Sequence, residues 1–310
     1  LNAPPHGFGN RHAVLRSPSP QGAVLLDNTS LQIKPGEDLL VTGPSGAGKT
    51  TLLHIIAGLE TPNSGSVQFI GTQRGKSPVS MVFQESALMP WRNVEENVPL
   101  GAEFRKEEPS VYKRISRFFL EVVNLLDFAG AQPHELSGGQ NQRVGVARAM
   151  ILRPKLVVCD EAVSALDVSI QAQILRLLTD LQRQYKTSFL FISHDLAVVR
   201  EISHNVLVLY LGRAVEYGPA ELILRDPRHP YTRALLSAAP TPDPEIARNK
   251  PRVRLVGDLP SPLDTRAPLR FLKSRLIDDP DAVQYHPRWQ EVGLGHFVAE
   301  HDPEDSAVAA

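Results

Sequence analysis

The 310-residue sequence has one cysteine, two tryptophans and no apolar run near 18 residues. A single cysteine cannot form a disulfide within the chain and excludes a metal site with several cysteine ligands. Because Cys159 lies in the apolar run 156–159, we expect a buried structural thiol. No transmembrane helix and no signal peptide is expected. The sequence therefore predicts a cytoplasmic protein that contacts a membrane only through a partner.

The chain also lacks an excess of charge of either sign. It carries 33 basic and 34 acidic residues, a net charge of −1 and a pI of about 6.9. A protein with a broad nucleic-acid footprint needs a basic excess or a basic stripe. We therefore expect no nucleic-acid partner.

Composition changes along the chain predict its organisation. Residues 1–20 are rich in proline, glycine and serine and read as an N-terminal extension. From 21 to 217, apolar strand-like runs alternate with helical patterns, which predicts an α/β domain with a mostly parallel sheet. Residues from about 88 to 150 look helical throughout, as expected of an inserted helical subdomain. Clustered prolines predict a loop-rich C-terminal extension over 218–310.

Several elements of the α/β domain are expected from local patterns. Apolar runs predict buried strands at 37–42, 156–159 and 188–193, and a helix is expected at 50–59. Between the last two strands, apolar residues at helical spacing predict a helix face packed in the core: Ile170, Ile174, Leu177, Leu178 and Leu181.

Residues 43–50 read GPSGAGKT and match the pattern G-x-x-x-x-G-K-[ST]. Glycines let the backbone fold into a loop whose N–H groups point at an anion. The helix that follows adds its positive N-terminal end. Lys49 can reach the β- and γ-phosphates of a nucleotide, and Thr50 can offer its hydroxyl to Mg²⁺. The strand before and the helix after this loop make a chance match a poor explanation.

An acidic pair follows the predicted strand 156–159. Asp160 is expected at the carboxyl end of that strand, where ligands of open α/β sheets bind, and is suited to hold Mg²⁺. Glu161 can act as general base on a water that attacks the γ-phosphate. Alone, the pair would be read as ordinary turn carboxylates; the phosphate loop favours the functional interpretation.

Residues 136–140 read LSGGQ and stand immediately before a helical segment. Ser137 and Gln140 form an S-x-x-Q capping box, so the stretch builds a helix N-terminus stripped of bulky side chains. Such an end binds anions through backbone N–H groups and the helix dipole. A plain helix cap is the simpler reading. Because the chain already has a phosphate loop, a second anion site suggests a γ-phosphate that belongs to another copy of the fold.

The order of phosphate loop, LSGGQ, Asp160-Glu161 and the sequence SALD at 164–167 resembles ATP-binding cassette (ABC) ATPases over about residues 21–265. The resemblance implies a P-loop NTPase fold that binds ATP and Mg²⁺. It also implies a head-to-tail pair with a second cassette subunit, with each ATP between the phosphate loop of one and the LSGGQ of the other. Permease subunits in the membrane would be further partners, which implies a peripheral location on the inner face of the cell membrane.

The resemblance also assigns roles. Gln84 resembles the glutamine of the family's glutamine loop, and His194, in FISHD, its histidine switch. The expected catalytic residues are Glu161, His194 and Gln84. The expected Mg²⁺ ligands are Thr50, Gln84 and Asp160. The expected nucleotide contacts are Gly43, Pro44, Ser45, Gly46, Ala47, Gly48, Lys49, Thr50, Thr51, Ser137, Gly138, Gly139, Gln140 and Asp167.

Two parts of the sequence point to different importers. Residues 164–174, 191–200 and 228–236, the last reading RHPYTRALL, are similar to ATPases of the oligopeptide, dipeptide and nickel group. The last stretch predicts a short helix that begins at Pro230, and its residues alone suggest no mechanism. Residues 83–94 look more like those of nitrate, sulfonate and taurine importers. The longer match favours peptide import, and a nitrate-type importer is the alternative. Residues 271–301 contain no cysteine, which excludes an iron–sulfur role for the tail.

One feature of the family is missing. Its members stack adenine on an aromatic residue about 20 residues before the phosphate loop, but residues 17–22 contain none. Stacking on an aromatic ring is worth about 1–3 kcal/mol per base. We expect weak discrimination between adenine and guanine, or a substitute such as Phe8.

Two functions outside transport fit the sequence less well. A soluble cassette ATPase for DNA repair would carry a long coiled coil between phosphate loop and LSGGQ, and one for translation usually carries two cassettes; this chain has neither. A regulatory module without turnover is disfavoured by the presence of Glu161 and His194.

Overall fold

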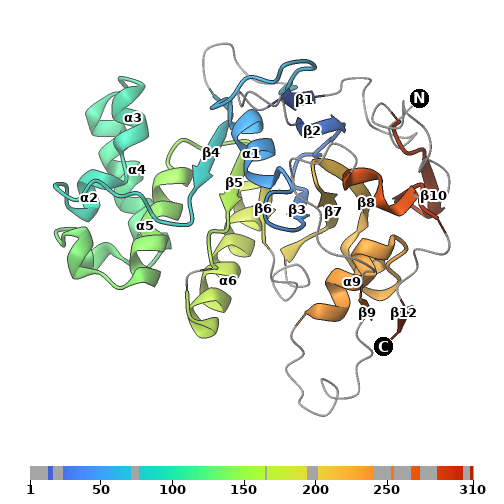
Figure 1. Ribbon diagram of the computed structural model, residues 1–310. Coiled ribbons are helices and arrows are strands. Elements are labelled where there is room, and N and C mark those ends of the chain that lie inside the picture. Colours follow the sequence, from blue (N-terminus) through green and yellow to red (C-terminus); the bar gives the residue numbers. More distant parts are fainter. Residues whose placement is uncertain are drawn as a thin grey trace. The chain divides into compact units, whose positions relative to one another are not determined.

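The computed structural model describes most of the chain (Figure 1). By their contacts the residues divide into two compact units, one drawn from 1–32, 39–68 and 194–310 and the other from 33–38 and 69–193. The phosphate-loop sequence lies in the first unit, and LSGGQ lies in the second. The residues described are 13–16, 24–70, 77–164, 166–193, 202–239, 253–254, 267–272, 285–302 and 308–309.

The first unit contains a mixed set of strands in the order β10, β11, β8, β7, β3. Strand β3 (Asp38–Thr42) runs parallel to β7 (Asn205–Tyr210). The pairings β7 with β8 (Arg213–Pro219), β8 with β11 (His296–Ala299) and β11 with β10 (Trp289–Gly293) are antiparallel.

Short connections explain the antiparallel strands. Only Leu211 and Gly212 separate β7 from β8, and both have positive φ, 44° and 82°. Only Leu294 and Gly295 separate β10 from β11. A connection of two residues joins antiparallel neighbours, because a parallel pair needs a crossover of a dozen residues or more.

The remaining elements of the first unit surround these strands. The helix predicted at 50–59 is α1 (Lys49–Ala57), directly after the phosphate loop. Two-stranded pairs form between β1 and β2 and between β9 and β12. The other described elements are β1 (Ala13–Arg16), β2 (Val24–Thr29), α8 (Ala220–Arg225), α9 (Pro230–Ala238), β9 (Val253–Arg254), η3 (Ala267–Leu272) and β12 (Val308–Ala309).

The second unit contains a parallel set of strands in the order β6, β5, β4. Strand β5 (Leu156–Asp160) pairs in parallel with both β4 (Val79–Val82) and β6 (Ser188–Ile192). All of β6 and the first four residues of β5 are buried. The strands predicted at 37–42, 156–159 and 188–193 are thus confirmed to within one residue at each end. Over residues 21–217, for which a mostly parallel sheet is expected, the pairs β3–β7, β4–β5 and β5–β6 are parallel and β7–β8 is antiparallel; β10 and β11 lie beyond that range.

Helices make up most of residues 88–150, as the sequence predicts. Figure 1 shows α2 to α5 grouped together. The boundaries of a separate helical subdomain, and those of the terminal extensions, stay predictions. The elements are α2 (Val94–Asn97), α3 (Leu100–Phe104), α4 (Pro109–Val122), η1 (Leu126–Phe128), η2 (Pro133–Glu135), α5 (Gly138–Met150) and, after β5, α6 (Val168–Tyr185).

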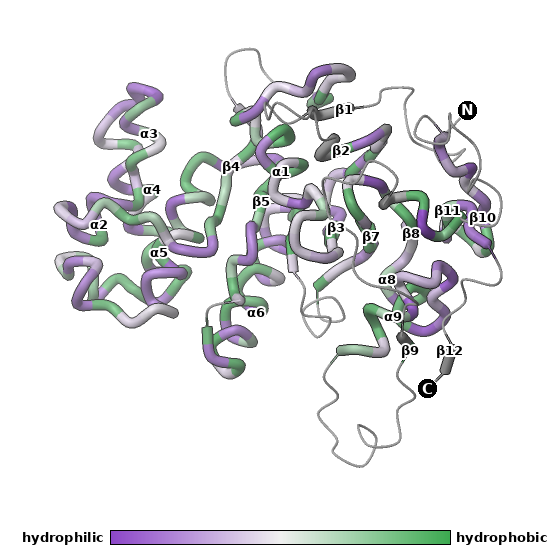
Figure 2. The backbone as a smooth tube through the Cα atoms, in the orientation of Figure 1, coloured by the Kyte–Doolittle hydropathy of each residue, from purple (hydrophilic) through white to green (hydrophobic). Residues whose placement is uncertain are grey.

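Helix α6 packs one face into the core of the second unit. Figure 2 shows hydrophobic and hydrophilic residues recurring along it. The buried residues are Ile174, Leu175, Leu178 and Leu181. Ile170 and Leu177 of the predicted stripe are only partly buried, and Leu175 takes a buried place instead. The helix face is rotated slightly from the predicted one.

Cys159 is free and fully buried in β5, as expected of a structural thiol. Burial raises the pKa of this thiol, and the nearby carboxylates Asp38 and Asp160 raise it further.

Among the helices in the described ranges, none has both the length and the hydropathy to cross a bilayer.

Candidate functional site

The phosphate loop is shaped by glycines with unusual backbone angles. Gly43, Gly46 and Gly48 have φ of 152°, 75° and 87°. A Cβ on Gly43 would lie 2.2 Å from the carbonyl oxygen of Leu209 in β7. The contact is with backbone, so no side-chain movement could relieve it. Only glycine fits where the chain leaves β3 and turns into the loop.

The end of this loop is an open helix N-terminus. Gly48 precedes α1 and supplies no capping side chain. The Lys49 ammonium donates to the carbonyl oxygens of Gly43 and Pro44, at 2.9 and 2.8 Å, which holds the charge beside the loop. Glycine conformations, a helix start without a side-chain cap and a lysine together fit a nucleotide triphosphate.

The loop is anchored to the core of its unit. Ala47 is buried, and its carbonyl oxygen accepts a 3.2 Å bond from the Gly212 N–H. Helix α1 buries Leu52 and Leu53. The outer positions face solvent: Ser45, Gly46 and Thr50 are exposed, and Pro44, Gly48, Lys49 and Thr51 are partly buried. The loop is therefore fixed on one side and open on the other.

In the second unit, β5 ends at the predicted acidic pair. Asp160 is its last residue and is partly buried. Glu161 follows with φ of 45°, a left-handed conformation that costs a non-glycine residue about 1–3 kcal/mol. The backbone N–H and hydroxyl of Ser164 both donate to the Glu161 carbonyl, at 3.0 and 2.9 Å. This turn holds Glu161 in its strained conformation.

Asp167 is the N-cap residue of α6, but only its backbone bonds to the helix. Its carbonyl oxygen accepts from the N–H groups of Ile170 and Gln171, at 2.9 and 2.8 Å. Its side chain makes no capping bond and is exposed. A carboxylate at a helix start ordinarily caps that helix, and the Asp167 carboxylate does not.

The LSGGQ stretch forms the predicted capping box at the start of α5. The Gln140 N–H donates to the Ser137 hydroxyl oxygen at 3.2 Å, and the Ser137 N–H donates to Gln140 Oε1 at 2.8 Å. A Cβ on Gly139 would meet Ile170 Cγ2 at 2.6 Å, so packing explains this glycine. A Cβ on Gly138 would make only an ordinary contact, and Gly138 is exposed. Packing within this chain does not require Gly138 to be glycine.

Of the two remaining predicted catalytic residues, Gln84 lies within the described residues. Gln84 is exposed and follows β4 by two residues. His194 lies outside the described residues, as do residues 17–22 and Phe8. Within the described ranges, no group of three or more histidine, cysteine, aspartate or glutamate side chains is arranged to hold a metal ion.

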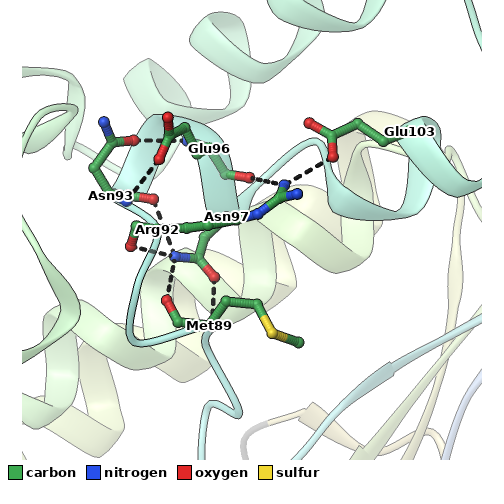
Figure 3. A network of polar contacts seen from close by, with 6 residues as sticks. All are labelled: Met89, Arg92, Asn93, Glu96, Asn97 and Glu103. Carbon is green, nitrogen blue, oxygen red and sulfur yellow. Dashed lines mark hydrogen bonds and ion pairs between the residues drawn. The ribbon is translucent and has the colours of Figure 1, made fainter.

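A buried asparagine organises the segment after Gln84 (Figure 3). Asn97 is fully buried in α2. Its oxygen accepts from the Met89 N–H at 2.7 Å, and its amide donates to the carbonyls of Met89, Arg92 and Asn93, at 3.1, 2.8 and 3.0 Å. Four bonds from one side chain fix residues 89–93. No sequence signal marks this asparagine, because its partners are backbone atoms.

The fixed segment presents a tryptophan. Trp91 is 75% exposed. The neighbouring Arg92 is held by an ion pair to Glu103 at 2.7 Å, and this bond raises the pKa of its guanidinium. The indole therefore stands on a backbone that is held on both sides.

The HPYT sequence in the first unit starts α9, as predicted for a short helix that begins at Pro230. The buried His229 is its N-cap, and the Nδ1 atom accepts from the Tyr231 N–H at 3.2 Å. The imidazole also packs edge-on against Phe271, with ring centroids 4.7 Å apart. Burial lowers the pKa of His229 well below its ordinary value, so the ring is neutral and can accept.

A buried carboxylate ties this helix start to the C-terminal strands. Glu216 in β8 is fully buried. It accepts from the backbone N–H groups of Arg228 and His229, at 2.8 and 3.0 Å, and its Oε1 lies 2.7 Å from Nε2 of His296 in β11. Sequence reasoning left the HPYT motif without a mechanism; its histidine and the residue before it are structural.

A phosphate loop, an acidic pair after a buried strand and a glycine helix start define the class of this protein as a P-loop ATPase. A family model described as "ABC transporter" matches residues 26–164, and one described as "Oligopeptide/dipeptide transporter, C-terminal region" matches 215–266. The chain belongs to the ATP-binding proteins of the ABC transporter family, which bind ATP and hydrolyse it in coupling to transport.

Relatives match along most of the chain. The "Oligopeptide transport ATP-binding protein OppF" of Haemophilus influenzae is 40% identical over 295 residues, covering 90% of this chain and 89% of its own. The OppF protein of Salmonella typhimurium is 42% identical over 283 residues, covering 86% and 85%. The "Di/tripeptide transport ATP-binding protein DppF" of Pseudomonas aeruginosa is 43% identical over 279 residues, covering 83% and 81%.

Proposed function

We propose that this protein is the ATP-binding subunit of an ABC importer and that its ATP hydrolysis drives peptide uptake across the cell membrane. The observation that carries the proposal is the extent of the match: relatives named for oligopeptide and di/tripeptide transport align with 83–90% of the chain. The alternative, a nitrate, sulfonate or taurine importer, rests on residues 83–94 alone and gains no support from these relatives.

The chemistry proposed for the site follows from the residue types. Glu161 acts as general base on the attacking water, and His194 contacts the γ-phosphate. Mg²⁺ would be held by the Thr50 hydroxyl, Gln84 and Asp160, and would neutralise charge on the phosphates. Lys49 and the backbone N–H groups of the loop bind the phosphates. The left-handed turn that carries Glu161 supports this assignment, because strained backbone is common at functional sites.

The proposed active form is a head-to-tail pair of cassettes. One phosphate loop and one LSGGQ per chain need two chains to complete two sites, and the second chain is the same or a homologous subunit. The exposed Gly138 supports this arrangement, since packing within the chain gives no reason for glycine there. The exposed carboxylate of Asp167 suits a contact across the same interface.

The proposed membrane partners are permease subunits, and the protein would lie peripherally on the inner face of the membrane through them. The surface proposed for this contact is the segment 83–94. It presents Trp91, and large aromatic side chains on a pre-organised backbone are typical anchors of protein interfaces.

The proposed function is tested by ATP hydrolysis in wild type and Glu161→Gln, with gel filtration in ATP and Mg²⁺. Loss of a proton-transfer group typically costs about 10²–10⁴-fold in rate. We expect turnover to fall by that amount while ATP binding is retained, and the variant to run as an ATP-dependent dimer. Wild-type turnover in Glu161→Gln would contradict the role of this residue.

A further inference from the structure

We propose that Arg148 and Gln142, both on α5, are positioning residues that hold the backbone around Gln84. The inference rests on the role of Gln84 given under the proposed function. It adds to that role the means by which an exposed side chain on a connecting segment is kept in place.

Gln142 holds the residue before Gln84. Its side chain is buried, and its Nε2 atom donates to the carbonyl oxygen of Phe83 at 2.9 Å. Phe83 is the first residue after β4. The backbone just before Gln84 is therefore held twice: it continues directly from β4, and its Phe83 carbonyl is bound by a side chain of α5.

Arg148 holds the segment just after Gln84. Its two terminal nitrogens donate separately to the carbonyl oxygens of Ser86 and Ala87, at 2.6 and 2.7 Å. Ala87 has a left-handed φ of 45°, so the backbone turns sharply at a residue that the guanidinium binds. Burial lowers the pKa of Arg148, but an arginine remains charged at any physiological pH. These are charge-assisted bonds in a fork geometry that lysine cannot reproduce.

One face of α5 carries both contacts. Gln142, Gly145 and Arg148 are spaced three residues apart, so Gly145 is a neighbour of both on the helix surface and the three span about 120° of it. A Cβ on Gly145 would lie 3.8 Å from the Cβ of Ser86, so the helix lies directly against the segment.

The same helix begins at the LSGGQ capping box. Helix α5 therefore connects two sites. Its N-terminus is the LSGGQ stretch proposed to contact a nucleotide, and its side chains bind the segment that carries Gln84. Displacing α5 would carry the carbonyls of Phe83, Ser86 and Ala87 with it. Gln84 can respond to the LSGGQ end of the helix without any contact between the two side chains.

The test compares ATP hydrolysis in Arg148→Met with a matched control, Arg143→Met. Arg143 lies on the same helix but donates to Val123 and Gln173, away from the segment. Misplacing a reacting group by about 1 Å can cost about 10²-fold. For Arg148→Met we expect kcat to fall about 10- to 100-fold, with less than about a 2-fold change in the KM for ATP. Arg148→Lys should lie between, because it can keep one of the two bonds.

A double-mutant cycle separates positioning from a general loss of structure. If Arg148 acts through Gln84, Arg148→Met should lower turnover no further when it is added to Gln84→Ala. Multiplying effects of the two changes would overturn the inference. So would wild-type turnover in Arg148→Met beside a strong loss in Gln84→Ala. Wild-type turnover in Gln84→Ala would instead refute the role of Gln84 itself, and the positioning role with it.

Hydrogen exchange gives a readout that does not need turnover. We expect the amides of residues 83–89 to exchange at least about 10-fold faster in Arg148→Met than in wild type or Arg143→Met, because these segments open more readily when their bonds are lost. Equal exchange in all three proteins would overturn the inference. A loss of protection over the whole chain would also count against it, since positioning predicts a local change.

Discussion

Replacing Asp38 by asparagine should make the stability of this protein much less dependent on pH. Asp38 is the first residue of β3 and only 3% exposed. Its Oδ1 accepts from the Phe189 N–H at 3.1 Å. Burial raises the pKa of this carboxyl from 3.8 to about 7; the Phe189 bond opposes that rise, and the charge of Glu37 adds to it.

The sign and size of the effect follow from the difference in pKa. The folded protein holds the Asp38 proton more tightly than the unfolded chain does, so protonation favours folding. This stabilisation is complete below about pH 4 and is lost as the pH rises to about 7. A difference of about three in pKa, at about 1.36 kcal/mol each, corresponds to about 4 kcal/mol of unfolding free energy.

Asp38→Asn removes the charge but keeps an oxygen that can accept from Phe189. We expect the unfolding free energy of the variant, minus that of wild type, to rise by about 4 kcal/mol between about pH 4 and about pH 8. Urea denaturation across this range measures it, with Asp180→Asn on the exposed surface of α6 as the control for loss of one charge. The same difference at both ends of the range would refute the reasoning.

Two further substitutions test packing in the first unit, one in the phosphate loop and one at the start of α9. In Gly43→Ala the new Cβ meets the Leu209 carbonyl, so the loop must shift; we expect ATP affinity, measured by titration with a fluorescent analogue, to fall about 5- to 150-fold, as a strain of about 1–3 kcal/mol implies. Gly130→Ala, which meets nothing within 4 Å, should bind ATP like wild type. His229→Ala removes a cap and a buried ring and should lower the unfolding free energy by about 2–5 kcal/mol, whereas His229→Asn should recover about 1 kcal/mol because it can still cap. Equal stability of His229→Ala and wild type in urea would contradict this role.

Local patterns predicted the elements that local interactions determine. The apolar runs gave β5 and β6, Ser137 and Gln140 gave the cap of α5, and Pro230 gave the start of α9. The cap of α5 and the start of α9 depend on contacts within a few residues, and the apolar runs of β5 and β6 mark segments that are buried whatever their partners. The phosphate loop was predicted for the same reason, since its glycines, its lysine and its helix are contiguous.

What the sequence did not predict depends on contacts between distant residues. The turn of Leu211 and Gly212 lacks the Asn-Gly signal of a tight hairpin, so the antiparallel β7 and β8 went unrecognised. Arg148 is 62 residues from the Ser86 carbonyl that it binds, and Glu216 is 80 residues from His296. The acceptor of Arg148 is a backbone carbonyl, which carries no residue identity. Glu216 and His296 pair through their side chains, but they are too far apart in the sequence for a local pattern to connect them.

The carboxylate of Glu216 limits where this chain can be cut. The C-terminal family match ends at residue 266, which invites a shortened protein that stops there. Such a fragment would keep Glu216 and lose His296, its only side-chain partner among the bonds described. A buried charge deprived of its partner typically costs about 3–5 kcal/mol. Deleting the tail should therefore lower the stability of the fold, and a loss of transport in such a variant would not by itself show that the tail acts in transport. Introducing Glu216→Gln along with the truncation removes the buried charge and avoids this effect.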